Sequence, residues 1–505
     1  MSGSGLATAV RDDSETPQQR RHRPAEMDEA GVRRVLDVAL RFGQLLLACQ
    51  AGTADVAATV AAVATAYGLP ATHVDITANS ITVSVPRGVA GAPVTAMYLA
   101  QSRSLDYTRL QLTTDLAQHV VDTTPEPEWV QRRLNALERA QHPYPRWVST
   151  VALGVMAGSF SMLLGAGLLV AAIAAVTTAL IDRVGRILNG WHLPMLFLQV
   201  VGATIATGVT VGLDAAGQLP AGTAPSVVVA ANIVALLSGL ATVGSVQDAI
   251  TGFQLTAVSR MMDILLSSVG ILVGVTIAVR IGVAAGVDVS VSPDVPVGPL
   301  GVPVRVLAGA VGAAASAVSS YAPVRAALAA GAAGATGALL FFGLRIAGVD
   351  QITSSFVAAA AIGLGGAIGA RRVRVPLLVI AMAGIVPLVP GMTLYRGFVH
   401  LVNGQATAGG NWLMLAAGTA LALGAGVVLG PLLAPSVRRE LARYRRRPRG
   451  GSRRHLLGQH RMPQLAGIRP RRPTTSASRT FRPRRRHPRI AAESTNQPAT
   501  VKRHD

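Results

Sequence analysis

Long apolar segments fill the centre of the chain and set its structural class. Between Trp147 and Pro435 the sequence contains no lysine and no glutamate, and the stretches 194–213 and 264–285 are almost wholly apolar. A helix needs about 20 apolar residues to cross roughly 30 Å of hydrocarbon. This pattern predicts a polytopic α-helical membrane protein.

Short polar breaks divide the apolar block into ten predicted transmembrane helices in two halves. The first half covers 147–285, an extracytoplasmic loop covers 286–304, and the second half covers 305–435. The ten predicted spans are 147–165, 167–181, 194–213, 225–245, 264–285, 303–322, 325–343, 353–370, 375–394 and 412–433. Five spans in each half would place related halves in opposite orientations, which is an inverted repeat.

The pattern before the apolar block is that of a soluble α+β domain. Residues 1–27 are polar and read as a flexible leader without an apolar signal segment, and residues 28–146 form the predicted cytoplasmic domain. Apolar positions at helical spacing alternate there with a stretch of period two. The predicted elements are helices at 32–46, 54–67, 107–122 and 127–141, a hairpin at 74–76 and 81–85, and a third strand at 93–100.

The formal charge of +21 is concentrated at the C-terminus. Residues 436–505 are rich in arginine and proline and lack apolar periodicity, which predicts a disordered cytoplasmic tail. Such a tail is expected to touch anionic lipid headgroups next to the last span, and no specific nucleic acid is expected. Arginines also gather in the loops on the side of both termini, which predicts a plasma-membrane protein with both termini in the cytoplasm.

Two segments at the ends of spans four and nine offer a test of the repeat. They are LLSGLATVGSVQDAITG (236–252) and LVPGMTLYRGFVHLVNG (388–404). Aligning Gly239 with Gly391 also aligns Gly252 with Gly404 and places Asp248 on His400. Chance is the alternative, because the chain contains 53 glycines.

Polar and helix-breaking residues in these segments are the candidate binding and proton-coupling residues. Pro387 and Pro390 each remove a backbone donor, and broken helices commonly line transport sites, with a purely mechanical kink as the alternative. Asp248 is a candidate for an ammonium or proton, with a solvated aspartate as the alternative. The further candidates are Ser238, Gly239, Thr242, Arg280, Arg345, Gly391, Thr393, Tyr395 and Arg396, where snorkelling to headgroups is the alternative for Arg280 and Arg345.

Several motifs together resemble the bacterial threonine/serine exporter family. They are LLLACQAGTADVAATVAAVATAYGL (45–69), the VDIT and ITVSV strands, SLDYTRL (104–110) and GIVPLVPGMTLYRG (384–397). The resemblance implies an inner-membrane exporter of threonine and serine driven by the proton motive force. The residues that match the family pattern in the first domain are Gly52, Thr53, Asp55, Asp106 and Tyr107. Ser238 departs from the Pro-Gly that the family has at the end of span four, which puts a kink there in doubt.

The local interpretation of the first-domain motif is helix capping. Thr53 is predicted to cap the second helix, and Asp55 lies in its first turn, where the helix dipole favours an anion.

Other functions are open alternatives to the exporter. They are an exporter of another small amino acid or of a dicarboxylate such as succinate, and a membrane-anchored scaffold whose tail binds lipid or nucleic acid. An enzyme is not expected, because the sequence shows no catalytic residues, nucleophile motif, cofactor site or metal-ligand cluster. The lone Cys49 provides neither a disulfide nor a cysteine metal site.

Overall fold

A computed structural model describes residues 27–446 except 88–90, 100–104, 192, 220–224, 237–238, 287–300, 374 and 403. The predictions for the leader, for the tail beyond Arg446, for most of the loop 286–304 and for Ser238 lie outside the described residues.

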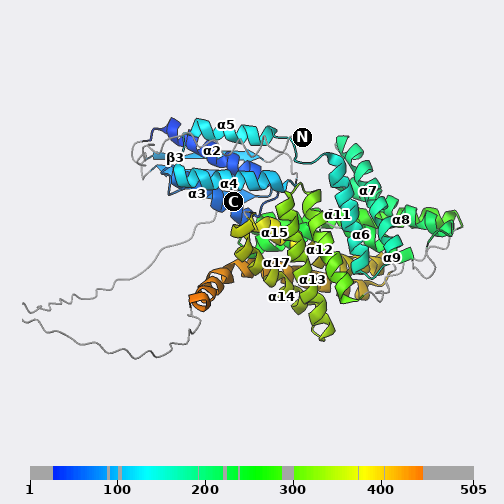
Figure 1. Ribbon diagram of the computed structural model, residues 1–505. Coiled ribbons are helices and arrows are strands. Elements are labelled where there is room, and N and C mark those ends of the chain that lie inside the picture. The colour runs from blue at the N-terminus through cyan, green and yellow to red at the C-terminus, as the bar shows by residue number, and fades with distance from the viewer. Residues whose placement is uncertain are drawn as a thin grey trace, which may run out of the picture. The chain divides into compact units, whose positions relative to one another are not determined.

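The described residues of the N-terminal region form four helices and one antiparallel sheet, as the sequence predicts. The helices are α2 (Glu29–Ala48), α3 (Thr53–Ala66), α4 (Tyr107–Thr123) and α5 (Pro127–Arg139), and the strands are β1 (His73–Thr77), β2 (Ser80–Arg87) and β3 (Gly91–Leu99). The strand order is β1-β2-β3. Helix α2 contacts the sheet and the other three helices, so it forms the centre of this region (Figure 1).

The sequence explains why α2 takes this central position. The side chain of Asp28 accepts a hydrogen bond from the Gly31 amide and caps the helix, and Leu36, Val38 and Phe42 are fully buried. Gly43 lets α2 approach the sheet, because a Cβ atom there would lie 2.9 Å from Ile81 Cδ1. The buried core continues from this region into the membrane helices through alanines such as Ala326.

The remaining helices are apolar and make the chain a polytopic helical membrane protein. They are α6 (Arg146–Leu163), α7 (Leu168–Gly190), α8 (Met195–Ala215), α9 (Pro225–Leu236), α10 (Gly239–Ile250), α11 (Gln254–Ala284), α12 (Val302–Ser319), α13 (Val324–Ile346), α14 (Gln351–Val373), α15 (Leu377–Ile385), α16 (Gly391–Val402) and α17 (Ala406–Arg446). Among the described residues, seven helices are long and apolar enough to span a membrane, or eight with one bent pair.

This number is smaller than the ten spans predicted, although each predicted span overlaps a helix. Helix α6 has 18 residues and includes Ser149, Thr150, Ser159 and Ser161, which lower its hydropathy. Helices α9 and α10 each have 12 residues and lie on either side of 237–238, so neither is long enough alone.

The predicted break in span nine is present. Helix α15 ends at Ile385, a 3₁₀ turn covers Val386–Leu388, and α16 begins at Gly391. The two helical parts are bent by 46°. Pro387 lies in the 3₁₀ turn and Pro390 directly precedes α16, which agrees with the missing donors of proline.

Corresponding helices recur at a nearly constant spacing. Helices α12, α13 and α14 begin 156 residues after α6, α7 and α8, and helices α15, α16 and α17 begin 152 residues after α9, α10 and α11. Helices α10 and α16 have 12 residues each and are followed by glycines with positive φ, Gly252 at +95° and Gly404 at +75°.

Close helix contacts recur at the same spacing. A Cβ atom on Gly274 of α11 would clash with the Val200 oxygen of α8, and one on Gly426 of α17 would lie 2.7 Å from the Phe356 oxygen of α14. Across the two sets, α6 packs against α12.

Candidate functional site

The break in span nine places polar side chains of α16 among neighbouring helices. Gln351 at the start of α14 donates from Nε2 to Thr393 Oγ1 at 3.2 Å and to Thr419 Oγ1 at 3.3 Å, which joins α14, α16 and α17. Thr393 is buried. The sequence analysis missed Gln351, although a glutamine that opens an apolar span is a recognisable signal.

Tyr395 carries an unsatisfied hydroxyl into the contact of α16 with α9. Its side chain is 2% exposed and packs with Val228, Ile233 and Ile271, while its Oη has no hydrogen-bond partner in the described part of the chain. Buried polar atoms are rarely left without a partner, so such an atom is a candidate ligand contact.

Gln199 and Ser355 also carry buried polar atoms that have no hydrogen-bond partner in the described part of the chain. These atoms are Gln199 Oε1 on α8 and Ser355 Oγ on α14. These residues are 156 residues apart, which is the spacing of their helices. Sequence reasoning missed both, because a lone polar residue in an apolar helix usually bonds its own backbone.

The candidate arginines lie in different surroundings. The guanidinium of Arg396 lies 4.9 Å from the centroid of the Trp412 ring, a cation–π contact between α16 and α17. Arg345 donates to the Val349 oxygen at 2.8 Å beyond the end of α13. Arg280 is exposed on α11, so the structure does not bring it together with the α16 residues.

Asp248 lies at the end of α10 and joins the membrane helices to the N-terminal region. It is 1% exposed, its Oδ1 accepts from the Thr53 amide at 3.1 Å, and its Oδ2 lies 2.8 Å from Arg260 Nη1 on α11. Its neighbour Thr242 is also buried on α10, one turn into the helix that begins at Gly239.

The predicted capping role of Thr53 is therefore wrong. Gly52 is the N-cap of α3 and provides no side-chain bond, and the Thr53 hydroxyl is buried without a partner among the described residues. The first amide of α3 is instead satisfied by the Asp248 carboxylate from 195 residues further along the chain. This arrangement also places an anion at the positive end of the helix dipole.

Asp106 and Tyr107 form a second connection between the N-terminal region and the membrane helices. Asp106 caps α4 through the Arg109 amide at 2.9 Å and pairs with His142 Nδ1 at 2.8 Å. The Tyr107 amide donates to the Ser320 oxygen at 2.9 Å. His142 stacks on Tyr321 at 4.1 Å, so α4 and the α5–α6 connection are held against the turn between α12 and α13.

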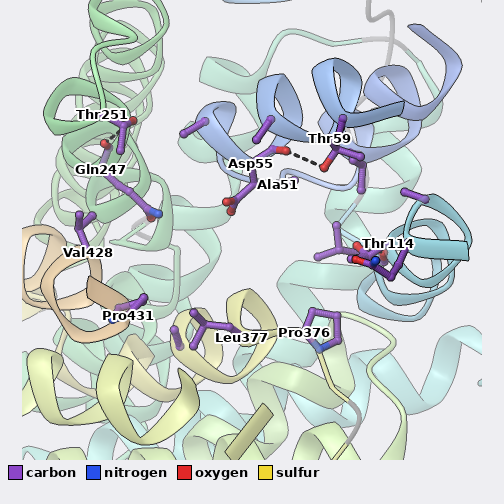
Figure 2. A pocket seen from close by; sticks show the side chains of 18 of the residues that line it. Ala51, Asp55, Thr59, Thr114, Gln247, Thr251, Pro376, Leu377, Val428 and Pro431 are labelled. Atoms are coloured by element: carbon purple, nitrogen blue, oxygen red, sulfur yellow. Dashed lines mark hydrogen bonds between the residues drawn. The ribbon is translucent and has the colours of Figure 1, made fainter. Parts of the chain in front are cut away.

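A cavity of about 570 Å³ lies between the N-terminal region and the membrane helices. Its walls come from α2, α3, α4, α10, α15 and α17, and Figure 2 shows Asp55 and Gln247 extending into it from different helices. Loss of hydration around the Asp55 carboxyl raises its pKa above the ordinary 3.8, and the nearby Asp248 carboxylate raises it further. Within the described ranges, no group of three or more His, Cys, Asp or Glu side chains could hold a metal ion.

Comparisons with known proteins agree over both parts of the chain. A family model described as "Putative threonine/serine exporter" matches residues 37–282, and a second model, described as "Threonine/Serine exporter, ThrE", matches residues 305–433. The chain is similar to a protein of Mycobacterium tuberculosis named "Probable threonine/serine exporter", with 37% identity over 82% of this chain and 78% of the relative.

A second relative gives the same result. The chain is 33% identical to a "Threonine/serine exporter" of Corynebacterium glutamicum, over 82% of this chain and 85% of the relative. No solved structure matches the chain.

Proposed function

Because the chain belongs to the threonine/serine exporter family, we propose that it carries threonine and serine out of the bacterial cell as a secondary transporter. The family consists of transporters, so the expectation that the chain is not an enzyme is confirmed. The observation that carries the proposal is the family match over both the N-terminal region and the membrane helices.

The proposed architecture is ten spans in two related halves of opposite orientation. The proposed boundaries are the predicted ones, with the cytoplasmic domain at 28–146 and the membrane halves at 147–285 and 305–435. The recurring helix spacing and the equivalent glycine contacts at Gly274 and Gly426 support this arrangement. The arginine-rich loops support a plasma-membrane orientation with both termini in the cytoplasm and a basic tail near anionic headgroups.

The proposed central binding site lies at the break between α15 and α16. A helix that begins inside the membrane offers free amides to a carboxylate, and α16 begins at Gly391. The unsatisfied Tyr395 hydroxyl and the Thr393 hydroxyl are suited to the polar groups of a hydroxy amino acid. Rocking of one half against the other would then expose the site to each side in turn.

The proposed driving force is the proton motive force, which makes the protein an antiporter of protons and amino acid. Asp248 is the proposed proton-coupling residue of the first half. Its pairing with Arg260 supports a role in which a change of charge alters the contact between α10 and α11.

Counterflow in proteoliposomes tests the proposal. Vesicles that contain the purified chain and unlabelled threonine should accumulate labelled threonine, and an imposed pH gradient should accelerate the flux. Serine should compete and succinate should not. A channel would give no accumulation, and exchange of succinate without exchange of threonine would contradict the proposed substrate.

A further inference from the structure

A cavity lies between α3 and the membrane helices. Its walls include α10 from the first set of membrane helices and α15 and α17 from the second. Helix α15 is one part of the bent pair formed with α16. The cavity therefore adjoins both sets of helices and the N-terminal region.

Among the residues that line the cavity, Asp55 carries the only charge. The carboxylate projects from α3 into the space shared with Gln247, Leu377 and Val428 (Figure 2). Arg260, on the neighbouring helix α11, is paired with Asp248 and is not among the lining residues. The cavity therefore favours a ligand that carries an ammonium group.

Further polar groups could hold the rest of such a ligand. Gln247 Oε1 is buried and has no hydrogen-bond partner in the described structure, which leaves an acceptor for a hydroxyl. The amides of Ala54 and Asp55 lie in the first turn of α3, where N–H groups have no partner within the helix, and such N–H groups can donate to a carboxylate. Apolar side chains such as Leu46 and Leu377 form the remaining wall.

From these groups we infer that the cavity is a loading site for the zwitterion of a small hydroxy amino acid, in which Asp55 binds the ammonium group. This inference rests on the proposed export of threonine and serine. It adds a binding step at the N-terminal region before the amino acid reaches the break at α16. A volume of about 570 Å³ lies in the usual range of roughly 300–1,000 Å³ for small-ligand sites.

The single cysteine of the chain allows a direct test. Cys49 is 2% exposed, and burial raises its pKa to about 12, so it should not react with thiol reagents. Ala58 is exposed and lines the cavity, whereas Thr65 is exposed on the same helix outside the lining. The full chain carrying Ala58→Cys or Thr65→Cys is treated in detergent with a methanethiosulfonate reagent, with and without threonine.

We expect threonine to slow the labelling of Ala58→Cys and to leave the labelling of Thr65→Cys unchanged. Adding Asp55→Asn to Ala58→Cys should raise the threonine concentration for half-protection about tenfold. The matched control is Asp115→Asn, because Asp115 is an exposed carboxylate on α4 outside the lining. It should not change that concentration.

Additional variants cover the case in which Asp55→Asn fails to fold. Asp55→Glu keeps the charge and should retain protection. Gln247→Leu removes the unpaired acceptor and should weaken protection by threonine severalfold while leaving protection by alanine, which has no hydroxyl, unchanged.

Counterflow and protection from labelling together distinguish failure of the loading site from failure of the proposed function. Threonine counterflow by the wild-type chain without protection of Ala58→Cys would overturn the loading site and leave the function standing. Protection that Asp55→Asn does not shift would reject Asp55 as the ammonium ligand. Absence of counterflow in the wild-type chain would reject the proposed function itself.

Discussion

Asp248 and Arg260 form the most buried ion pair in the described part of the chain, with side chains 1% and 12% exposed. The sequence identified Asp248 as an unusual charge near the end of a span. It could not identify Thr53 as a partner, because that contact joins residues 195 positions apart. In the structure Asp248 therefore also connects α10 to the N-terminal region, beside its predicted role as a substrate or proton ligand.

Replacing Asp248 should weaken this connection. Asp248→Asn keeps an acceptor for the Thr53 amide and leaves Arg260 without an anion, and breaking a buried pair costs about 3–5 kcal/mol. We expect a lower melting temperature in detergent and a lower rate of threonine efflux at equal expression. The double variant Asp248→Asn with Arg260→Gln removes the orphaned charge and should recover part of the stability. Wild-type melting and efflux in Asp248→Asn would contradict both roles.

Asp55 should make stability depend on pH in a particular direction. Its pKa in the folded chain is raised above 3.8, so the folded chain binds this proton more tightly than the unfolded chain. The stability that results from tighter proton binding is fully present below pH 3.8 and is lost as the pH rises through the pKa of Asp55 in the folded chain. Asp55→Asn should therefore raise the melting temperature at pH 7, and the gain should shrink towards pH 4.

Asp350 provides a comparison with the opposite sign. Hydrogen bonds from Thr353 lower the pKa of this exposed carboxyl, so its contribution is present at neutral pH and is lost as the pH falls through the folded pKa. Asp350→Asn should not stabilise the chain at pH 7. An equal gain in both variants would show that removal of any acidic residue has the same effect.

Removing the Tyr395 hydroxyl distinguishes a role of this group in binding from a role of the ring in packing. Tyr395→Phe keeps the ring among Val228, Ile233 and Ile271 and removes an oxygen that has no partner in the described structure. We expect the free energy of unfolding to stay within about 1 kcal/mol of wild type. The KM for threonine in proteoliposomes should rise severalfold. An unchanged KM would remove Tyr395 from the proposed site.

At the scale of elements, local signals in the sequence were sufficient for much of the fold. Alternation at Ile81, Val83 and Val85 predicted β2, and the prolines at 387 and 390 predicted the break before α16. The break in span four was in doubt because Ser238 replaces the family's proline. Residues 237–238, where that kink would lie, are outside the described residues.

Contacts between distant elements had no local signal. Gln351 joins three helices through Thr393 and Thr419, and nothing near Gln351 in the sequence specifies these partners. The cavity likewise depends on helices from three parts of the chain. Some residues of the candidate site, such as Thr393 and Tyr395, could therefore be predicted from the sequence, but Gln351 and the contacts between the helices could not.

The break before α16 should be needed for transport. Pro390→Ala restores a backbone donor, which favours continuation of the helix across the break. We expect threonine counterflow to fall at least severalfold while the melting temperature stays equal or rises. Pro323→Ala is the control, because Pro323 precedes α13 at its N-cap and interrupts no helix. Equal counterflow in both variants would show that the break is only a packing feature.

At the scale of the whole molecule, the two sets of membrane helices correspond to the two family models. One match ends at residue 282 and the other begins at residue 305. Contacts of α6 with α12, of α10 with α17 and of α9 with α16 hold the sets together. The N-terminal region is attached to both sets, through Asp248 in the first and Ser320 in the second.

Two fragments of the chain, each carrying one set of membrane helices, should therefore reassemble. Co-expressed fragments 1–293 and 294–505 should restore threonine efflux to cells that lack the exporter, because the helix contacts between the sets do not require a covalent link. Each fragment alone should give no efflux. Efflux from the first fragment alone would contradict the need for both sets, and joint expression without copurification would contradict a stable interface.

The bond between Thr53 and Asp248 also imposes an order on biosynthesis. Thr53 leaves the ribosome 195 residues before Asp248. At about 5–20 residues per second, the nascent N-terminal region waits roughly 10–40 seconds for the carboxylate that completes α3. During that time the start of α3 is open to water and to chaperones. The region reaches its final form only after α10 has been synthesised.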